Sequence, residues 1–395
     1  MPQRRTISSR SLWAMLWNRA ANLFRKTLCA RPLMLKNLAF PIKSYGDTDF
    51  VTGLRAYAAL AVMLIHAGGA GLVQLHPLLA QLVFLGQTGV YVFFVISGFS
   101  VTASYRTTAH FTTYLSKRFM RIAPLYYVLL LGLFLLQPLT NGNMPASWDT
   151  EFGVKYDLYN LFMHLSFLSF LDYKITNSVI GVEWTLSIEM FWYILLPLLL
   201  TLVTNWQRAL TLLIASIALY FSLQCQQEAA THIHTRHIFE WSPLFYACAF
   251  SLGVLAYYIR PLVSNFATKH GDKFFIALLV VGIAAFLSFA PQKSAGIPTY
   301  ADTLLTASAF TFALIVLGTN QSLLVRALLL NRAALYLGTI SYGLYLIHFP
   351  LVIFFRGLIE NKTLLFSAVF VTTVLASHLS YRFIERPALK LIKKP

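Results

Sequence analysis

The chain has 395 residues, of which 57% are hydrophobic and only 11% are charged, and its mean hydropathy is +0.65. About a quarter of the residues in a soluble globular domain are charged, so this composition excludes that class and predicts an integral membrane protein. The formal net charge is +17. Because basic residues of a membrane protein usually mark its cytoplasmic loops, this charge does not indicate a nucleic-acid partner.

Mainly apolar runs recur along most of the chain, and each is long enough to cross about 30 Å of hydrocarbon as a helix. We therefore expect an all-α polytopic protein with about ten transmembrane helices embedded in a lipid bilayer. The predicted spans are 51–73, 82–104, 121–138, 185–204, 208–224, 241–259, 274–290, 302–319, 335–356 and 363–384.

The distribution of Lys and Arg predicts the orientation of these spans. Basic residues are dense before the first span, in alternate loops after it and in the C-terminal tail, which places both termini in the cytoplasm. The predicted organisation is a basic cytoplasmic segment at 1–46, a transmembrane domain at 47–388 and a basic cytoplasmic tail at 389–395.

Two short segments are predicted to lie at the membrane surface. The stretch LWAMLWNRAANLFRKTL within residues 1–46 is able to form an amphipathic helix on an anionic leaflet. Residues 158–171 are apolar but too short for a span, so we expect an interfacial or re-entrant helix there. The three cysteines are far apart in the sequence, and no metal site is expected.

The first span contains an arginine and a histidine, in GLRAYAALAVMLIH. Arg55 and His66 are eleven positions apart, which corresponds to three helical turns plus roughly 20°, so both side chains project from one face, about 16 Å apart along the axis. This face would carry a cation at the inner mouth and a titratable base deeper in the membrane. The alternative is that Arg55 extends to the interface and His66 makes a packing hydrogen bond.

Further polar residues are candidates for the same site. Arg118 and Arg121, in KRFMRIAPLYY, are three positions apart and suit a phosphate-bearing ligand, although ordinary cytoplasmic basic residues would have the same spacing. Glu189 is expected at a depth similar to that of His66, where a carboxylate would orient the imidazole, whereas Glu183 is expected at the surface.

The remaining motifs fit packing as well as function. In TGVYVFFVISGFSV, the small residues Gly89, Ser97 and Gly98 predict close helix approach. In GTISYGLYLIHFPLV, His348 is expected mid-membrane with Tyr345 nearby, either lining the acceptor side or making a structural hydrogen bond.

Six segments in this order resemble the integral-membrane acyltransferase 3 family, which O-acylates sugars, envelope polysaccharides, lipopolysaccharide, peptidoglycan or secreted natural products. The resemblance extends from about residue 47 to 388. The segments are GLRAYAALAVMLIH, GVYVFFVISGF, RFMRIAPLYY, WTLSIEMFWYILLP, GTISYGLYLIHFPL and SYRFIERP.

The resemblance implies a membrane O-acetyltransferase in which His66 acts as the base on an acceptor hydroxyl. Arg55 and Glu189 would also be catalytic residues, with Glu189 near the histidine. Arg118 and Arg121, together with Arg55, would bind the acyl-CoA. The substrate-side candidates are Trp184, Ser187, His348 and Tyr345.

The family resemblance also implies the donor, the acceptor and the location. No permanently bound cofactor is expected, acetyl-CoA is the expected donor substrate, and the acceptor is expected to be a sugar or polysaccharide such as lipopolysaccharide. The expected location is the bacterial cytoplasmic (inner) membrane. The alternative function is a proton-coupled transporter in which Arg55, His66 and Glu189 form the polar path.

Overall fold

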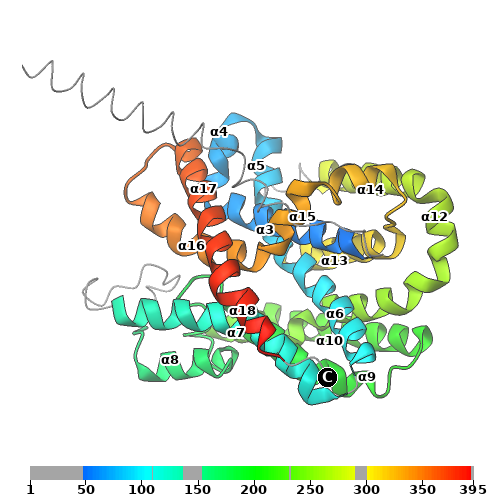
Figure 1. Cartoon of the computed structure of the whole chain (residues 1–395), viewed down its shortest axis with the longest axis horizontal. Helices are drawn as coiled ribbons and strands as arrows, with labels where there is room; N and C mark the ends of the chain where they lie inside the picture. Colours follow the sequence, from blue (N-terminus) through cyan, green and yellow to red (C-terminus); the bar gives the residue numbers. More distant parts are fainter. Residues whose placement is uncertain (1–47, 109, 137–153, 231–232, 290–299, 393–395) are drawn as a thin grey trace, which may run out of the picture. The chain divides into compact units, whose positions relative to one another are not determined.

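The computed structural model describes residues 48–108, 110–136, 154–230, 233–289 and 300–392, and every regular element within them is a helix (Figure 1). The prediction of an all-α protein is confirmed for this part of the chain. The amphipathic helix predicted within residues 1–46 lies outside the described residues. The longer helices are α3 (Asp49–His66), α6 (Gly89–Thr107), α7 (Phe111–Leu136), α9 (Trp184–Leu200), α10 (Trp206–Ala229), α12 (Ala247–Phe289), α13 (Tyr300–Leu317), α16 (Ser341–Arg356) and α17 (Lys362–Ser380).

Short helices and helical turns join these elements. They are η1 (Gly68–Gly71), α4 (Leu72–Leu75), α5 (Pro77–Phe84), η2 (Leu85–Thr88), α8 (Leu158–Leu165), η4 (Ser169–Leu171), α11 (Ile233–Glu240), η5 (Pro243–Tyr246), α14 (Leu323–Leu328), α15 (Arg332–Thr339), the π-helical η7 (Tyr381–Glu385) and α18 (Arg386–Lys390).

Six helical segments of the described chain are long and apolar enough to cross a membrane, and a bent helix pair raises this number to seven. The protein is therefore an integral membrane protein, while the predicted count of about ten spans is not confirmed. The cytoplasmic location of both termini also stays a prediction. The six segments are Asp49–His66, Pro77–Thr107, Phe111–Leu136, Trp206–Ala229, Pro243–Gly282 and Lys362–Lys390.

The loop predicted between spans 241–259 and 274–290 is wrong, because α12 is one helix of 43 residues. At 1.5 Å per residue it is about 65 Å long, roughly twice the hydrocarbon thickness, and Figure 1 shows it as a curved helix. Polar residues in the middle of α12 form hydrogen bonds with neighbouring segments while the helix itself stays continuous. The Arg260 side chain donates to the Gly318 carbonyl at 2.7 Å, and the Asp272 carboxylate accepts from the Ser322 hydroxyl before α14.

The span predicted at 335–356 is not one straight helix, because α15 and α16 meet at an angle of 70°. The bend falls at Ile340, directly after the point where α15 crosses α3. Gly338 makes that crossing possible, since a Cβ at this position would overlap the carbonyl oxygen of Thr52. The bend turns α16 so that it also packs against α3.

Helix α6 packs against α3, α9, α12 and α13, and its glycines allow these close contacts. A Cβ at Gly98 would overlap the carbonyl oxygen of Phe250 in α12, and one at Gly89 would meet the carbonyl oxygen of Ala58 in α3. The packing role predicted for Gly89 and Gly98 is confirmed. Ser97 differs, because its hydroxyl points to Glu189 of α9.

The eight-residue helix α8 occupies part of the segment predicted to be interfacial or re-entrant. A helix of this length rises only about 12 Å and does not cross a bilayer. Asp157 caps it, with the carboxylate accepting from the backbone N–H of Asn160 at 2.9 Å. The prediction that this stretch is not a span is confirmed.

Candidate active site

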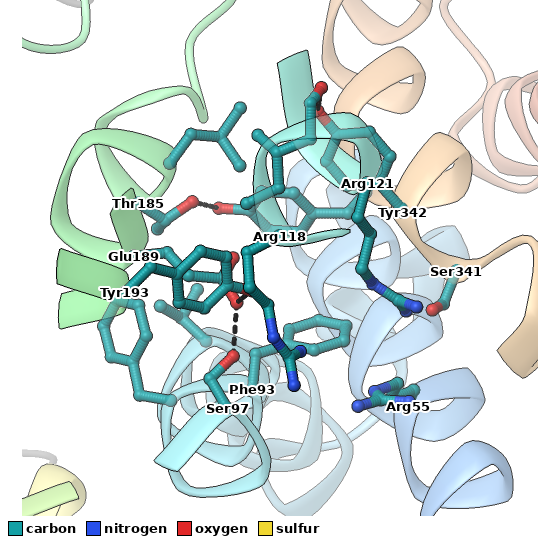
Figure 2. A pocket seen from close by; sticks show the side chains of 15 residues that line it. Arg55, Phe93, Ser97, Arg118, Arg121, Thr185, Glu189, Tyr193, Ser341 and Tyr342 are labelled. Atoms are coloured by element: carbon teal, nitrogen blue, oxygen red, sulfur yellow. Dashed lines mark hydrogen bonds between the residues drawn. The ribbon is translucent and has the colours of Figure 1, made fainter. Parts of the chain in front are cut away.

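An open pocket with an empty volume of about 650 Å³ lies among α3, α6, α7, α9 and α16 (Figure 2). Three guanidinium groups gather around it, together with one carboxylate and several hydroxyl groups. The lining residues are Arg55, Val90, Phe93, Phe94, Ser97, Arg118, Arg121, Ile122, Thr185, Leu186, Glu189, Tyr193, Ser341, Tyr342 and Tyr345.

Arg55 and Arg118 are both anchored to Ser100 of α6. The Arg55 side chain donates to the Ser100 hydroxyl at 3.0 Å, and the Arg118 side chain donates to the Ser100 carbonyl at 2.6 Å. The sequence motifs do not indicate this role of Ser100, although it follows Ser97 by three positions on the same helix face. These bonds hold two cations from different helices beside each other.

Arg118 and Arg121 lie on one face of α7, as their spacing predicts for a helix that begins at Phe111. The Arg118 guanidinium lies 5.5 Å from the ring centre of Tyr193. Its Nε is buried and has no hydrogen-bond partner among the described residues. The pocket therefore offers donor groups of the kind that phosphate oxygens accept from.

Glu189 belongs to this arginine pocket, where its carboxylate accepts from the hydroxyl groups of Ser97 and Tyr193, the latter at 2.5 Å. We expected the carboxylate beside the imidazole of His66, but the structure places the side chain of another residue, His348, at that imidazole. Tyr193 follows Glu189 by four positions on α9, and this spacing brings two side chains together on one helix face. The spacing is the sequence feature that indicates their hydrogen bond.

His66 ends α3, and its Nδ1 lies 2.9 Å from Nε2 of His348 in α16. The His66 ring also packs edge-on against Phe349, with ring centres 4.9 Å apart. The side chain of Arg356 donates to the backbone carbonyl of His66 at 3.1 Å. Three residues of α16 thus fix the end of α3.

Tyr345 connects the arginine pocket with the histidine pair. It lines the pocket, and its ring centre lies 6.1 Å from that of His348 and 5.8 Å from that of Phe93. Its hydroxyl donates to the Val182 carbonyl at 3.0 Å and accepts from the Thr185 hydroxyl at 3.0 Å. The described lining of the pocket includes neither His66 nor His348, so Tyr345 is a lining residue whose ring also contacts the histidine pair.

The prediction that Glu183 lies at the surface is wrong, because its side chain is fully buried. Its carboxylate accepts from the backbone N–H groups of Val179, Gly181 and Val182, at 2.6, 2.5 and 2.9 Å. Gly181 makes this loop possible with a φ of +93°. The carboxylate therefore shapes the loop whose Val182 carbonyl holds Tyr345.

Trp184 and Ser187, expected on the substrate side, do not line the pocket in the described structure. Trp184 packs with Trp241 and Tyr246, at ring-centre distances of 5.1 and 5.6 Å. Ser187 is fully buried, and its Oγ lies 2.6 Å from that of Ser169. Within the described residues no group of three His, Cys, Asp or Glu side chains is arranged to hold a metal ion.

The sequence matches the acyltransferase domain family over residues 48–382. The chain belongs to this family. The resemblance seen in the six motifs is confirmed, and so is the prediction of an enzyme that catalyses acyl transfer. No solved structure matched the chain.

Several curated proteins are similar to the chain. Nodulation protein 10 of Rhizobium leguminosarum bv. viciae is 28% identical over 364 residues, which cover 86% of this chain and 92% of the relative. The putative acetyltransferase ORF330 of Acidianus two-tailed virus is 25% identical, over 75% of this chain and 81% of the relative. O-acetyltransferase OatA of Staphylococcus aureus is 24% identical over 86% of this chain, which spans 56% of the length of OatA.

Proposed function

We propose that the protein transfers an acetyl group from cytoplasmic acetyl-CoA to a hydroxyl of a sugar-containing acceptor, with His66 as the general base. The acceptor we favour is an envelope polysaccharide or lipopolysaccharide, and the proposed location is the bacterial inner membrane. The names of the acetyltransferase relatives support acetyl as the transferred group.

One observation carries this proposal, namely the arginine pocket of α3, α6 and α7. Arg55 and Arg118 are held side by side by Ser100, and Arg121 faces the same space in Figure 2. Guanidinium groups bind phosphate oxygens in a bidentate manner, and coenzyme A carries three phosphoryl groups. A donor bound there would direct its pantetheine arm past Tyr345 toward the histidine pair.

In the proposed reaction His66 removes the proton from the acceptor hydroxyl as the oxygen attacks the thioester carbonyl. The carbon–oxygen bond of the ester forms, and the bond between the acyl carbon and sulfur breaks. The proton on His66 then passes to the departing thiolate, which leaves as free coenzyme A. No oxidant, reductant or metal ion is needed for this balance.

Acetyl-CoA turnover by the purified protein tests the proposal. Release of free thiol would be followed with a panel of sugar acceptors, in the wild type, His66→Ala and the matched control His110→Ala, whose side chain is exposed. Loss of a general base typically costs a factor of 10² to 10⁴ in rate. We expect that loss in kcat for His66→Ala alone, with the KM for acetyl-CoA unchanged.

Two outcomes would contradict the proposal. Equal acceptor-dependent thiol release by His66→Ala and His110→Ala would exclude His66 as the base. A wild-type protein that neither binds nor consumes acetyl-CoA would instead support the transporter alternative, which needs an ion gradient and no coenzyme.

The phosphate contacts have a test of their own. Acetyl-dephospho-CoA lacks the 3′-phosphate, so we expect the wild type to bind it less tightly than acetyl-CoA. If Arg118 or Arg121 binds that phosphate, its replacement by Gln will raise the KM for acetyl-CoA and reduce the discrimination between the two donors. Unchanged discrimination in both variants would remove the phosphate role of this pair.

A further inference from the structure

The hydrogen bonds of His348 determine which of its ring nitrogens carries the proton. Its Nδ1 lies 3.1 Å from the backbone carbonyl oxygen of Leu344, one helical turn earlier in α16. A carbonyl oxygen only accepts, so Nδ1 of His348 is the donor and carries the hydrogen. In the neutral ring, Nε2 of His348 then bears the lone pair.

The same reasoning extends from His348 to His66. Nε2 of His348 lies 2.9 Å from Nδ1 of His66, and a hydrogen bond between them needs one hydrogen. Since His348 has placed its hydrogen on Nδ1, the hydrogen comes from Nδ1 of His66. The lone pair of the neutral His66 ring therefore lies on Nε2.

The relative orientation of the two rings agrees with this hydrogen bond. Their planes differ by only 18°, while the ring centres are 5.1 Å apart, far more than the 2.9 Å between the bonded nitrogens. The rings therefore meet edge to edge, not face to face. The lone pair of an imidazole nitrogen lies in the ring plane, so Nε2 of His348 accepts in the correct direction. His348 is fully buried, and packing of α16 holds it there.

We propose that His348 is a positioning residue that holds His66 in the tautomer protonated at Nδ1, so that Nε2 of His66 is the basic nitrogen. This inference rests on the proposed function of His66. It gives His348 a different role from a side chain that lines the acceptor site. A residue behind the catalytic histidine that selects its tautomer has a large effect in serine proteases, where the wrong tautomer lowers kcat about 10⁴-fold.

The proton transfers balance in this arrangement. Nε2 of His66 takes the proton of the acceptor hydroxyl, and the ring becomes an imidazolium that still donates from Nδ1 to His348. The carbonyl of Leu344 keeps the hydrogen of His348 on Nδ1 throughout, so Nε2 of His348 remains the acceptor. Nε2 of His66 then returns its proton to the thiolate of coenzyme A, and the hydrogen on Nδ1 never leaves the pair.

The direct test is ¹⁵N NMR of the full-length protein with labelled histidines, with the His66 signals assigned by their loss in His66→Ala. We expect a protonated Nδ1 and an unprotonated Nε2 on His66 in the wild type. An Nε2-protonated His66 would overturn the inference. This readout is independent of activity, so it separates failure of the inference from failure of the proposed function.

Two variants supply the kinetic test. The side-chain oxygen of Gln in His348→Gln is able to accept from Nδ1 of His66, whereas Leu in His348→Leu preserves bulk without an acceptor. We expect His348→Leu to lower kcat at least 100-fold with the KM for acetyl-CoA unchanged, and His348→Gln to restore kcat to within about tenfold of the wild type. Equal kcat values for the two variants would contradict the positioning role. If the two His348 variants have equal kcat values but His66→Ala is inactive, only the positioning role of His348 is contradicted, and the proposed function of His66 stands.

Discussion

The guanidinium of Arg55 donates a hydrogen bond to the side-chain hydroxyl of Ser100 across 3.0 Å. This bond joins α3 to α6 at the arginine pocket, and the carbonyl of the same serine holds Arg118 of α7. Three helices therefore meet at one small residue. Mutual repulsion would push these cations apart, and the bonds to Ser100 hold them together where a phosphate would neutralise them.

Replacing Ser100 by Ala tests the two contacts separately, because it removes the side-chain hydroxyl and keeps the backbone carbonyl. Arg55 loses its anchor while Arg118 keeps its own. A hydrogen bond to a charged group contributes about 1.5–3 kcal/mol, so we expect the KM for acetyl-CoA to rise roughly tenfold with kcat little changed. Steady-state thiol release measures this effect, with Ser104→Ala on the same helix as the control. A KM equal to that of the control would contradict it.

The sequence predicts those parts of the site that lie within one helix. Arg55 and His66 share α3, and Arg118 and Arg121 share α7, so helical geometry alone fixes which face each pair occupies. Pairings between helices depend on the rotation and depth of each helix, which apolar periodicity does not determine. For this reason Glu189 was expected beside His66, whereas the structure places it with Ser97 and Tyr193.

The same limit applies to the fold. Apolar runs located the helices, but hydropathy does not distinguish a loop from a polar stretch that remains helical, as in α12 around Arg260. A bend such as that between α15 and α16 depends on where Gly338 meets α3. The burial of Glu183 depends on the backbone N–H groups of its own loop, and the pattern of side chains in the sequence does not reveal such bonds.

The contacts of Glu189 predict different effects for two substitutions. Gln at this position keeps a side-chain oxygen that accepts from the hydroxyl groups of Ser97 and Tyr193. Leu has no acceptor, so both hydroxyl groups lose their hydrogen-bond partner, which costs about 1–3 kcal/mol of stability for each buried group. We expect Glu189→Gln to retain thiol-release activity and thermal stability close to wild type, and Glu189→Leu to lose both. If Glu189 were instead the charged partner of His66, Glu189→Gln would lower kcat as strongly as Glu189→Leu.

The close approach of α6 and α12 predicts that Gly98→Ala destabilises the fold. The added Cβ would overlap the carbonyl oxygen of Phe250, and backbone in a packed helix does not move cheaply. Gly132 of α7 is the matched control, since a Cβ there meets nothing within 4 Å. We expect thermal unfolding in detergent to show a fall in Tm for Gly98→Ala. Gly132→Ala should be neutral or stabilising by up to about 1 kcal/mol. Equal Tm values would mean that the contact is not tight.

The burial of His164 in α8 predicts that the protein loses stability in mild acid. The side chain is fully buried in α8, its Nδ1 donates to the Asn160 carbonyl at 2.9 Å, and its Nε2 lies 3.6 Å from the Glu183 carboxylate. Burial lowers the pKa of His164 below its usual value, and the nearby carboxylate only partly opposes this effect.

The direction of the pH effect follows from proton binding. Histidine in the unfolded chain has a pKa of about 6.5, so as the pH falls through that value the unfolded state binds a proton that the folded state does not. Stability is therefore lost as the pH falls from 7.5 to 5.5. We expect the Tm of the wild type to decrease over this range, and the decrease to be smaller in His164→Gln, which has no proton to gain. His110→Gln, at an exposed position, should follow the wild type. The same decrease in His164→Gln as in the wild type would assign the acid sensitivity to another group.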